Sequence, residues 1–60
     1  MHLAQQLLEK GFDKDHVIRI LKNLAGSPDS TFEKEMAAII PLDIRIKFLE
    51  EGLDIVEKYK

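Results

Sequence analysis

Hydrophobic residues recur along the chain at spacings of three and four, which is the period of an amphipathic helix. The first such segment, roughly residues 2–10, has its apolar side at Leu3, Leu7 and Leu8. Gly11 ends it, because glycine adopts at little cost the left-handed conformation that a helix terminus commonly requires. The pattern therefore predicts a short helix closed by a glycine.

A second amphipathic segment covers roughly residues 14–25. Asp13 is placed to cap its start, and Gly26 is placed to end it. Its hydrophobic residues form one stripe, which consists of Val17, Ile20, Leu21, Leu24 and Ala25. This segment predicts a helix with one buried face and one solvated face.

A third helix is predicted at roughly residues 28–40, and the following proline ends it. Two starts are open. Ser27 can act as a cap before a proline at the first helical position. Alternatively, Ser30 and Glu33 have the spacing of a capping box, which starts the helix three residues later. Either start leaves one apolar face, formed by Phe32, Met36, Ile39 and Ile40.

The fourth predicted helix, roughly residues 43–59, is the longest and has two apolar rows. The first row has the spacing of a heptad seam and consists of Leu42, Ile46, Leu49, Leu53 and Val56. The second row consists of Ile44, Phe48, Gly52, Ile55 and Tyr59. Together the rows cover more than half of the circumference, whereas an ordinary surface helix needs a stripe of about 100°.

Two interpretations of the second row are open. It can be core, covered by the three shorter helices. Alternatively it stays uncovered and binds a partner or a second copy, because soluble monomers seldom expose a large apolar patch. Gly52 costs about 1 kcal/mol relative to alanine inside a helix, and its lack of a side chain lets another backbone approach. The second interpretation predicts a partner-binding surface at Ile44, Phe48, Gly52, Ile55 and Tyr59.

Composition limits the chain to one small domain, residues 1–60, of the all-α class with three short helices and a longer fourth. A core of this size supplies only about 3–5 kcal/mol, so such domains commonly need an additional staple. The chain has no cysteine, which excludes disulfides and leaves helix packing or oligomerisation. No apolar run approaches the length of a membrane span and no secretory signal is visible, so we expect a cytoplasmic protein.

Candidate chemistry is sparse. His2 and His16 are the only histidines, and a metal site needs several converging ligands. Asp13-Lys14-Asp15 resembles the start of a calcium loop but lacks the later glycine and glutamate. We therefore expect no catalytic residues, no metal site and no cofactor, and we expect that the chain is not an enzyme.

A DNA-binding helix-turn-helix is an alternative, since a short glycine-containing turn joins the second and third predicted helices. The segment that would enter the groove, residues 28–35, carries three acidic residues and one basic residue. Binding to DNA depends on neutralising phosphates with lysine and arginine. The charge therefore argues against nucleic acid. A partly basic face on the last helix, at Arg45, Lys47, Lys58 and Lys60, argues for it.

Residues 3–41 resemble ubiquitin-associated (UBA) domains. The resemblance rests on Leu7-Leu8-Glu9-Lys10-Gly11-Phe12, with a glycine-aromatic pair after the first helix, and on the amphipathic helix that follows. It extends to Ile39-Ile40-Pro41. UBA domains are compact three-helix modules that bind ubiquitin, so the resemblance implies a binding surface at Gly11, Phe12, Ile39 and Ile40.

The sequence thus predicts a small regulatory domain that works through protein–protein interaction. The expected partner is another protein or a second copy in a homodimer, and the C-terminal helix is the expected contact. The UBA-like ubiquitin-binding module and the DNA-binding regulator remain the two alternatives.

Overall fold

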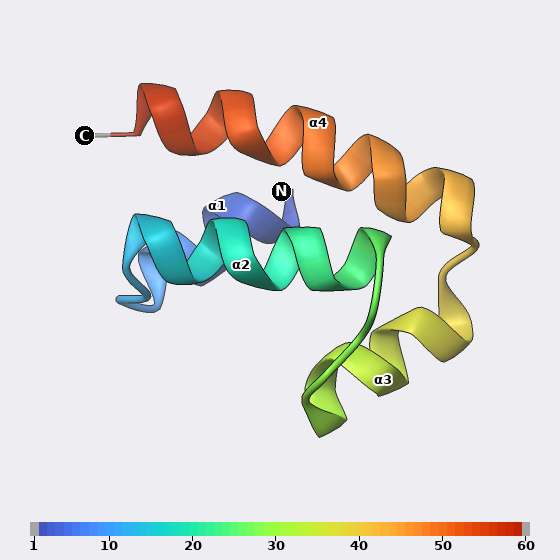
Figure 1. Ribbon diagram of the computed structural model, residues 1–60. Coiled ribbons are helices and arrows are strands. Elements are labelled where there is room, and N and C mark those ends of the chain that lie inside the picture. The colour runs from blue at the N-terminus through green and yellow to red at the C-terminus, as the bar shows by residue number, and fades with distance from the viewer. Residues whose placement is uncertain (1, 60) are drawn as a thin grey trace.

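A computed structural model describes residues 2–59 as four helices, with no strand among these residues. The helices are α1 (Leu3–Glu9), α2 (Lys14–Ala25), α3 (Thr31–Ile39) and α4 (Leu42–Lys58). Figure 1 shows α4 lying along α1 and α2, with α3 set apart beside one end of α2. The all-α class with a longer C-terminal helix is confirmed.

Local signals explain where the helices begin and end. Gly11 has φ of 101°, the left-handed conformation expected after α1, and the Phe12 amide donates a hydrogen bond to the Leu7 carbonyl at 3.2 Å. Of the two starts open for α3, the structure has the later one. The Ser30 hydroxyl accepts from the Glu33 amide at 3.2 Å, and the Glu33 carboxylate accepts from the Ser30 amide at 3.2 Å. Residues 28–30 therefore lie outside the helix.

The core lies where α4 crosses α1 and α2. Its buried hydrophobic side chains come mainly from α1 and α2, and they are Ala4, Leu7, Leu8, Val17, Ile20, Leu21, Leu24 and Val56. The α2 and α4 helices are antiparallel. Lys14 at the start of α2 donates to the Tyr59 carbonyl at 2.8 Å, and Arg45 near the start of α4 donates to the Leu24 carbonyl at 2.8 Å. None of the helices within residues 2–59 has the length and apolar character of a membrane-crossing segment.

Glu33 joins α3 to the rest of the domain. Only 4% of this residue is exposed, although it is charged. Its carboxylate accepts hydrogen bonds from the Asp29 amide at 2.8 Å and from Asn23 Nδ2 on α2 at 3.3 Å. Burial by itself raises the pKa of Glu33, but these bonds and the one from Ser30 outweigh it. The pKa therefore lies below its ordinary value of 4.5.

We expect Glu33→Gln to reduce stability at neutral pH by about 1–2 kcal/mol, since the neutral amide accepts the same bonds less strongly. A depressed pKa stabilises the folded state above the unfolded-state value, and this stabilisation is lost as pH falls through the folded-state value. The difference in unfolding free energy between wild type and variant should therefore shrink on acidification below about pH 4.5. Urea denaturation of both proteins from pH 7 to pH 3 measures it, and a gap independent of pH would contradict this assignment.

Candidate functional site

The second apolar row of α4 is the more buried of the two rows. Gly52 is buried, and Phe48, Ile55 and Tyr59 pack against the core. The interpretation that leaves this row uncovered is therefore wrong for Gly52. Phe48, Ile55 and Tyr59 are partly buried against the core, as the alternative interpretation expects. Of the predicted partner-binding set, only Ile44 is exposed, with 41% of its surface accessible.

Gly52 is the physical reason for this orientation. A Cβ added there would clash with Leu21 Cδ1 on α2 and would lie 3.4 Å from Ala4 Cβ on α1. The glycine thus lets α4 approach both helices at their crossing. The close approach that the sequence suggested is real, but the neighbour belongs to the same chain.

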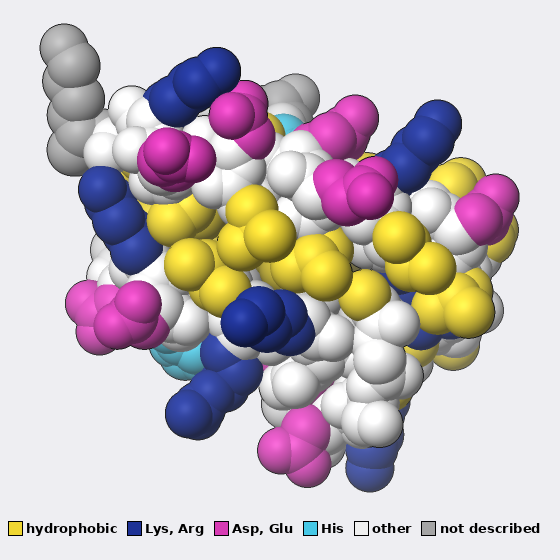
Figure 2. Space-filling model, turned by 45° about the horizontal axis from the view of Figure 1, so that its top comes forward, with side chains coloured by type: hydrophobic (Ala, Val, Ile, Leu, Met, Phe, Trp, Pro, Cys, Tyr) yellow, Lys and Arg dark blue, Asp and Glu magenta, His cyan; other side chains and the backbone are white. Residues whose placement is uncertain are grey.

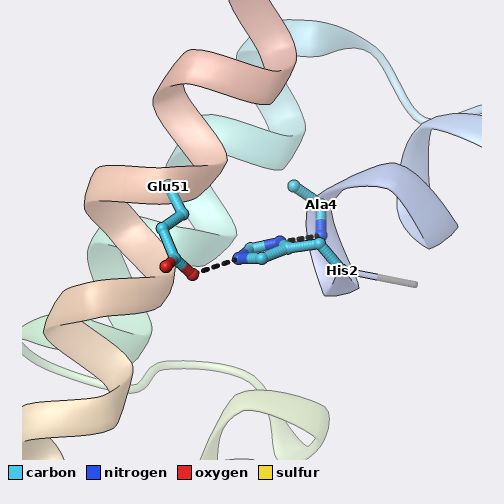
Figure 3. Close-up of polar contacts among 3 residues, drawn as sticks. All are labelled: His2, Ala4 and Glu51. Carbon is cyan, nitrogen blue, oxygen red and sulfur yellow. Dashed lines mark hydrogen bonds and ion pairs between the residues drawn. The ribbon is translucent and has the colours of Figure 1, made fainter.

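His2 holds the start of α1 against the same row. Its Nδ1 accepts from the Ala4 amide at 3.0 Å and caps the helix, and its Nε2 lies 3.4 Å from Glu51 Oε1 on α4 (Figure 3). Its ring also meets the Phe48 ring edge-on, with centroids 5.1 Å apart. The sequence gives little signal for this role, because histidine is not a common N-cap residue.

The row predicted to be the packing seam is partly exposed instead. Leu42, Ile46 and Leu53 are 51%, 43% and 39% accessible, although Val56 at the end of this row is buried. The structure leaves these side chains uncovered because α1 packs on the other flank of α4, where His2 meets Phe48. The other three helices therefore leave part of the apolar surface of α4 uncovered.

The matching side of α2 continues this surface. Ile20, on one flank of α2, lines a groove with Leu7 of α1. Helical geometry places Ile18 and Ala25 on the opposite flank, so they face away from α1 as Leu53 does. We call this surface the open seam, and it consists of Ile18, Ala25, Leu42, Ile46, Leu49 and Leu53. Figure 2 shows a continuous hydrophobic band across this face of the molecule.

Charged side chains border the open seam differently on its two long edges. Asp43, Glu50 and Glu57 recur every seven residues on α4, each three or four residues from Ile46 or Leu53. On α2, Lys14 and Lys22 are each four residues from Ile18, and Asp15 is three residues from it. Figure 2 shows mainly acidic side chains above the band and a basic side chain directly below its middle. The α4 edge is therefore acidic, whereas the α2 edge has two basic residues and one acidic residue.

The UBA-like surface is divided in the structure. Phe12 is exposed in the loop after α1, and it lines a groove of about 370 Å³ with Phe32 and Ser30 near the start of α3. Ile39 and Ile40 lie at the other end of α3, and neither lines this groove. Gly11 and Phe12 thus share a loop, but the groove beside them does not include the end of α3.

Polar side chains also gather at the start of α2. A shallow charged hollow of about 290 Å³ is lined by Asp13, Asp15, His16 and Arg19. Within residues 2–59, no group of three or more His, Asp or Glu side chains could hold a metal ion. Glu33, one of the acids counted against DNA binding, faces inward and takes no part in the surface charge of α3.

Comparisons with known proteins add no family. No protein-family model matches the chain, and neither curated proteins nor solved structures give a match.

Proposed function

We propose that this chain is a small non-catalytic domain that regulates or assembles proteins by binding through the open seam. The proposal keeps the C-terminal helix as the contact but moves the binding surface from the inward row to the row with Ile46 and Leu53. It concerns binding to protein and does not involve a cofactor.

One observation carries the proposal. The longest helix exposes Leu42, Ile46 and Leu53 along one flank, and the partly buried Ile18 on α2 borders the same surface. Isolated surface hydrophobics are normal, but a contiguous apolar band bordered by charge is typical of a protein interface. Covering it would also add stability to a domain whose own core is small.

Site-specific photo-crosslinking tests the proposal. A photoreactive phenylalanine analogue is placed at Ile46 in cells that express the protein, and in a matched control at Ile44. These residues have nearly equal exposure, 43% and 41%, but lie on opposite flanks of α4. We expect protein adducts from position 46 and few from position 44. Binding through the open seam would be contradicted if position 46 gave no adducts, or if it gave no more adducts than position 44.

A further inference from the structure

We propose that the occupant of the open seam is a second copy of this chain, related by a two-fold axis that runs parallel to α4. This inference rests on the proposed function and names its partner. In the resulting dimer, α4 of each copy lies over α2 of the other, and the four helices form one bundle.

The charge on the two edges selects this arrangement. Two copies can stack face to face about an axis parallel to α4 or about an axis across it. An axis across α4 places acidic edge over acidic edge, so that Glu50 and Glu57 meet like charges. An axis parallel to α4 places the acidic edge over the partner's α2 edge, where Lys14 and Lys22 outnumber Asp15. Like-charge juxtaposition in an interface is costly, so the parallel axis is favoured.

The register along the helices gives specific charge pairs. In one chain, Leu21 lies against Gly52, and Lys14 reaches the Tyr59 carbonyl. These contacts fix which residues of α2 and α4 are level. Lys22 is within one residue of the level of Glu50, and Lys14 is within two residues of the level of Glu57. A two-fold axis parallel to the helices preserves these levels, so Glu50 of one copy faces Lys22 of the other.

Glu50 and Lys22 can each form an ion pair with a partner molecule. Glu50 and Lys22 are exposed, and among residues 2–59 the ion pairs are His2 with Glu51 and Asp54 with Lys58. Glu50 and Lys22 therefore take part in neither pair within one chain.

Helix direction agrees with the same arrangement. The α2 and α4 helices of one chain are antiparallel, as their end contacts show. The parallel two-fold axis places α4 over the partner's α2, again antiparallel. Each helix of the four then has antiparallel neighbours, the arrangement of an up-down four-helix bundle with an apolar centre. The open seams of both copies supply that centre.

Sedimentation equilibrium measures the association. We expect wild type to dimerise and Ile46→Glu to raise the dissociation constant about 100-fold or more, since the variant places a charge in the apolar centre. Ile44→Glu is the matched control and should dimerise as wild type does. Circular dichroism verifies that each variant keeps its helices. A wild type that stays monomeric up to millimolar concentration would overturn the inference.

A charge swap tests the arrangement itself. Glu50→Lys and Lys22→Glu should each weaken the homodimer about tenfold, because each creates two like-charge contacts. Mixing the two variants should favour the heterodimer, in which one contact is native and the other is reversed but still attractive. Native mass spectrometry of the mixture distinguishes the three species. A statistical mixture with unchanged homodimer affinity would overturn the two-fold axis parallel to α4.

The two proposals fail separately. If wild type is monomeric and position 46 crosslinks only to other proteins, the second copy is excluded while binding through the open seam stands. If position 46 crosslinks to nothing and wild type is monomeric, both proposals fall. Adducts of twice the chain mass from position 46 support both.

Discussion

Gly52→Leu is expected to destabilise the domain by about 3 kcal/mol, most of the stability available to a core of this size. Gly52 is buried, and any side chain there enters the space of Leu21, which is itself fully buried. The space cannot be created without separating α4 from α2 or displacing Leu21 from its packing. Gly52→Ala should cost less, about 1 kcal/mol net, because its better helix propensity offsets part of the clash.

A double-mutant cycle assigns this loss to the contact. Leu21→Ala alone creates a cavity and should cost about 2–5 kcal/mol. In that background Gly52→Ala should become neutral or stabilising, since the added methyl group now has space and the helix gains propensity. Thermal and urea unfolding measure all four proteins. Additive losses, with no coupling between the two positions, would show that Gly52 does not mark the crossing of α4 over α2.

Arg45→Ala is expected to cost about 2–3 kcal/mol. The Arg45 guanidinium donates from Nε to the Ile40 carbonyl and from Nη1 to the Leu24 carbonyl, both at 2.8 Å. These carbonyls belong to the ends of α3 and α2, where backbone groups lack helical partners and carry partial negative charge. One side chain thus joins three helices, and its removal leaves two partly buried acceptors without this donor.

Arg45→Lys is the conservative control for charge. The lysine ammonium is a single point donor and cannot reproduce the two divergent bonds of the guanidinium, so we expect it to recover less than half of the loss. Hydrogen exchange at the last turn of α2 should also become faster in both variants. Full stability in Arg45→Lys would contradict the bridging role and would leave only an effect of net charge.

The helices could be predicted from the sequence because their signals are local. Gly11 and the Ser30–Glu33 pair act through neighbours within a few residues, and the structure has both features where the pattern indicates them. The earlier start of α3 was an open alternative. The hydrogen bonds of Glu33 to Asp29 and Ser30 decide it, since they use the amides that precede the helix.

The orientation of α4 could not be predicted because both of its rows have helical periodicity. Periodicity shows which residues share a face, but not which face meets α1 and α2. Gly52 decides the orientation through its fit against Leu21 and Ala4, and that fit depends on residues distant in the sequence. Both apolar rows follow from the periodicity, whereas the row that stays exposed depends on the fit at Gly52.

The long-range polar contacts also could not be predicted from the sequence. Arg45 was counted as part of a basic face, but it turns inward to the ends of α2 and α3. His2 has no role that its spacing indicates, but it caps α1 and contacts α4 (Figure 3). In both cases the partner atom lies on another helix or in the backbone, where side-chain spacing gives no signal.

We propose that the flank of α4 facing away from α1 is covered when the protein acts, and that the flank with Ile44 is not. Methyl-labelled protein with a soluble gadolinium chelate measures this coverage directly at low and high protein concentration. We expect the chelate to relax the Ile44 and Ile46 methyl groups equally in the dilute monomer. At high concentration we expect only Ile46 to become protected. Equal relaxation of both residues at every concentration, in a protein that remains folded, would contradict it.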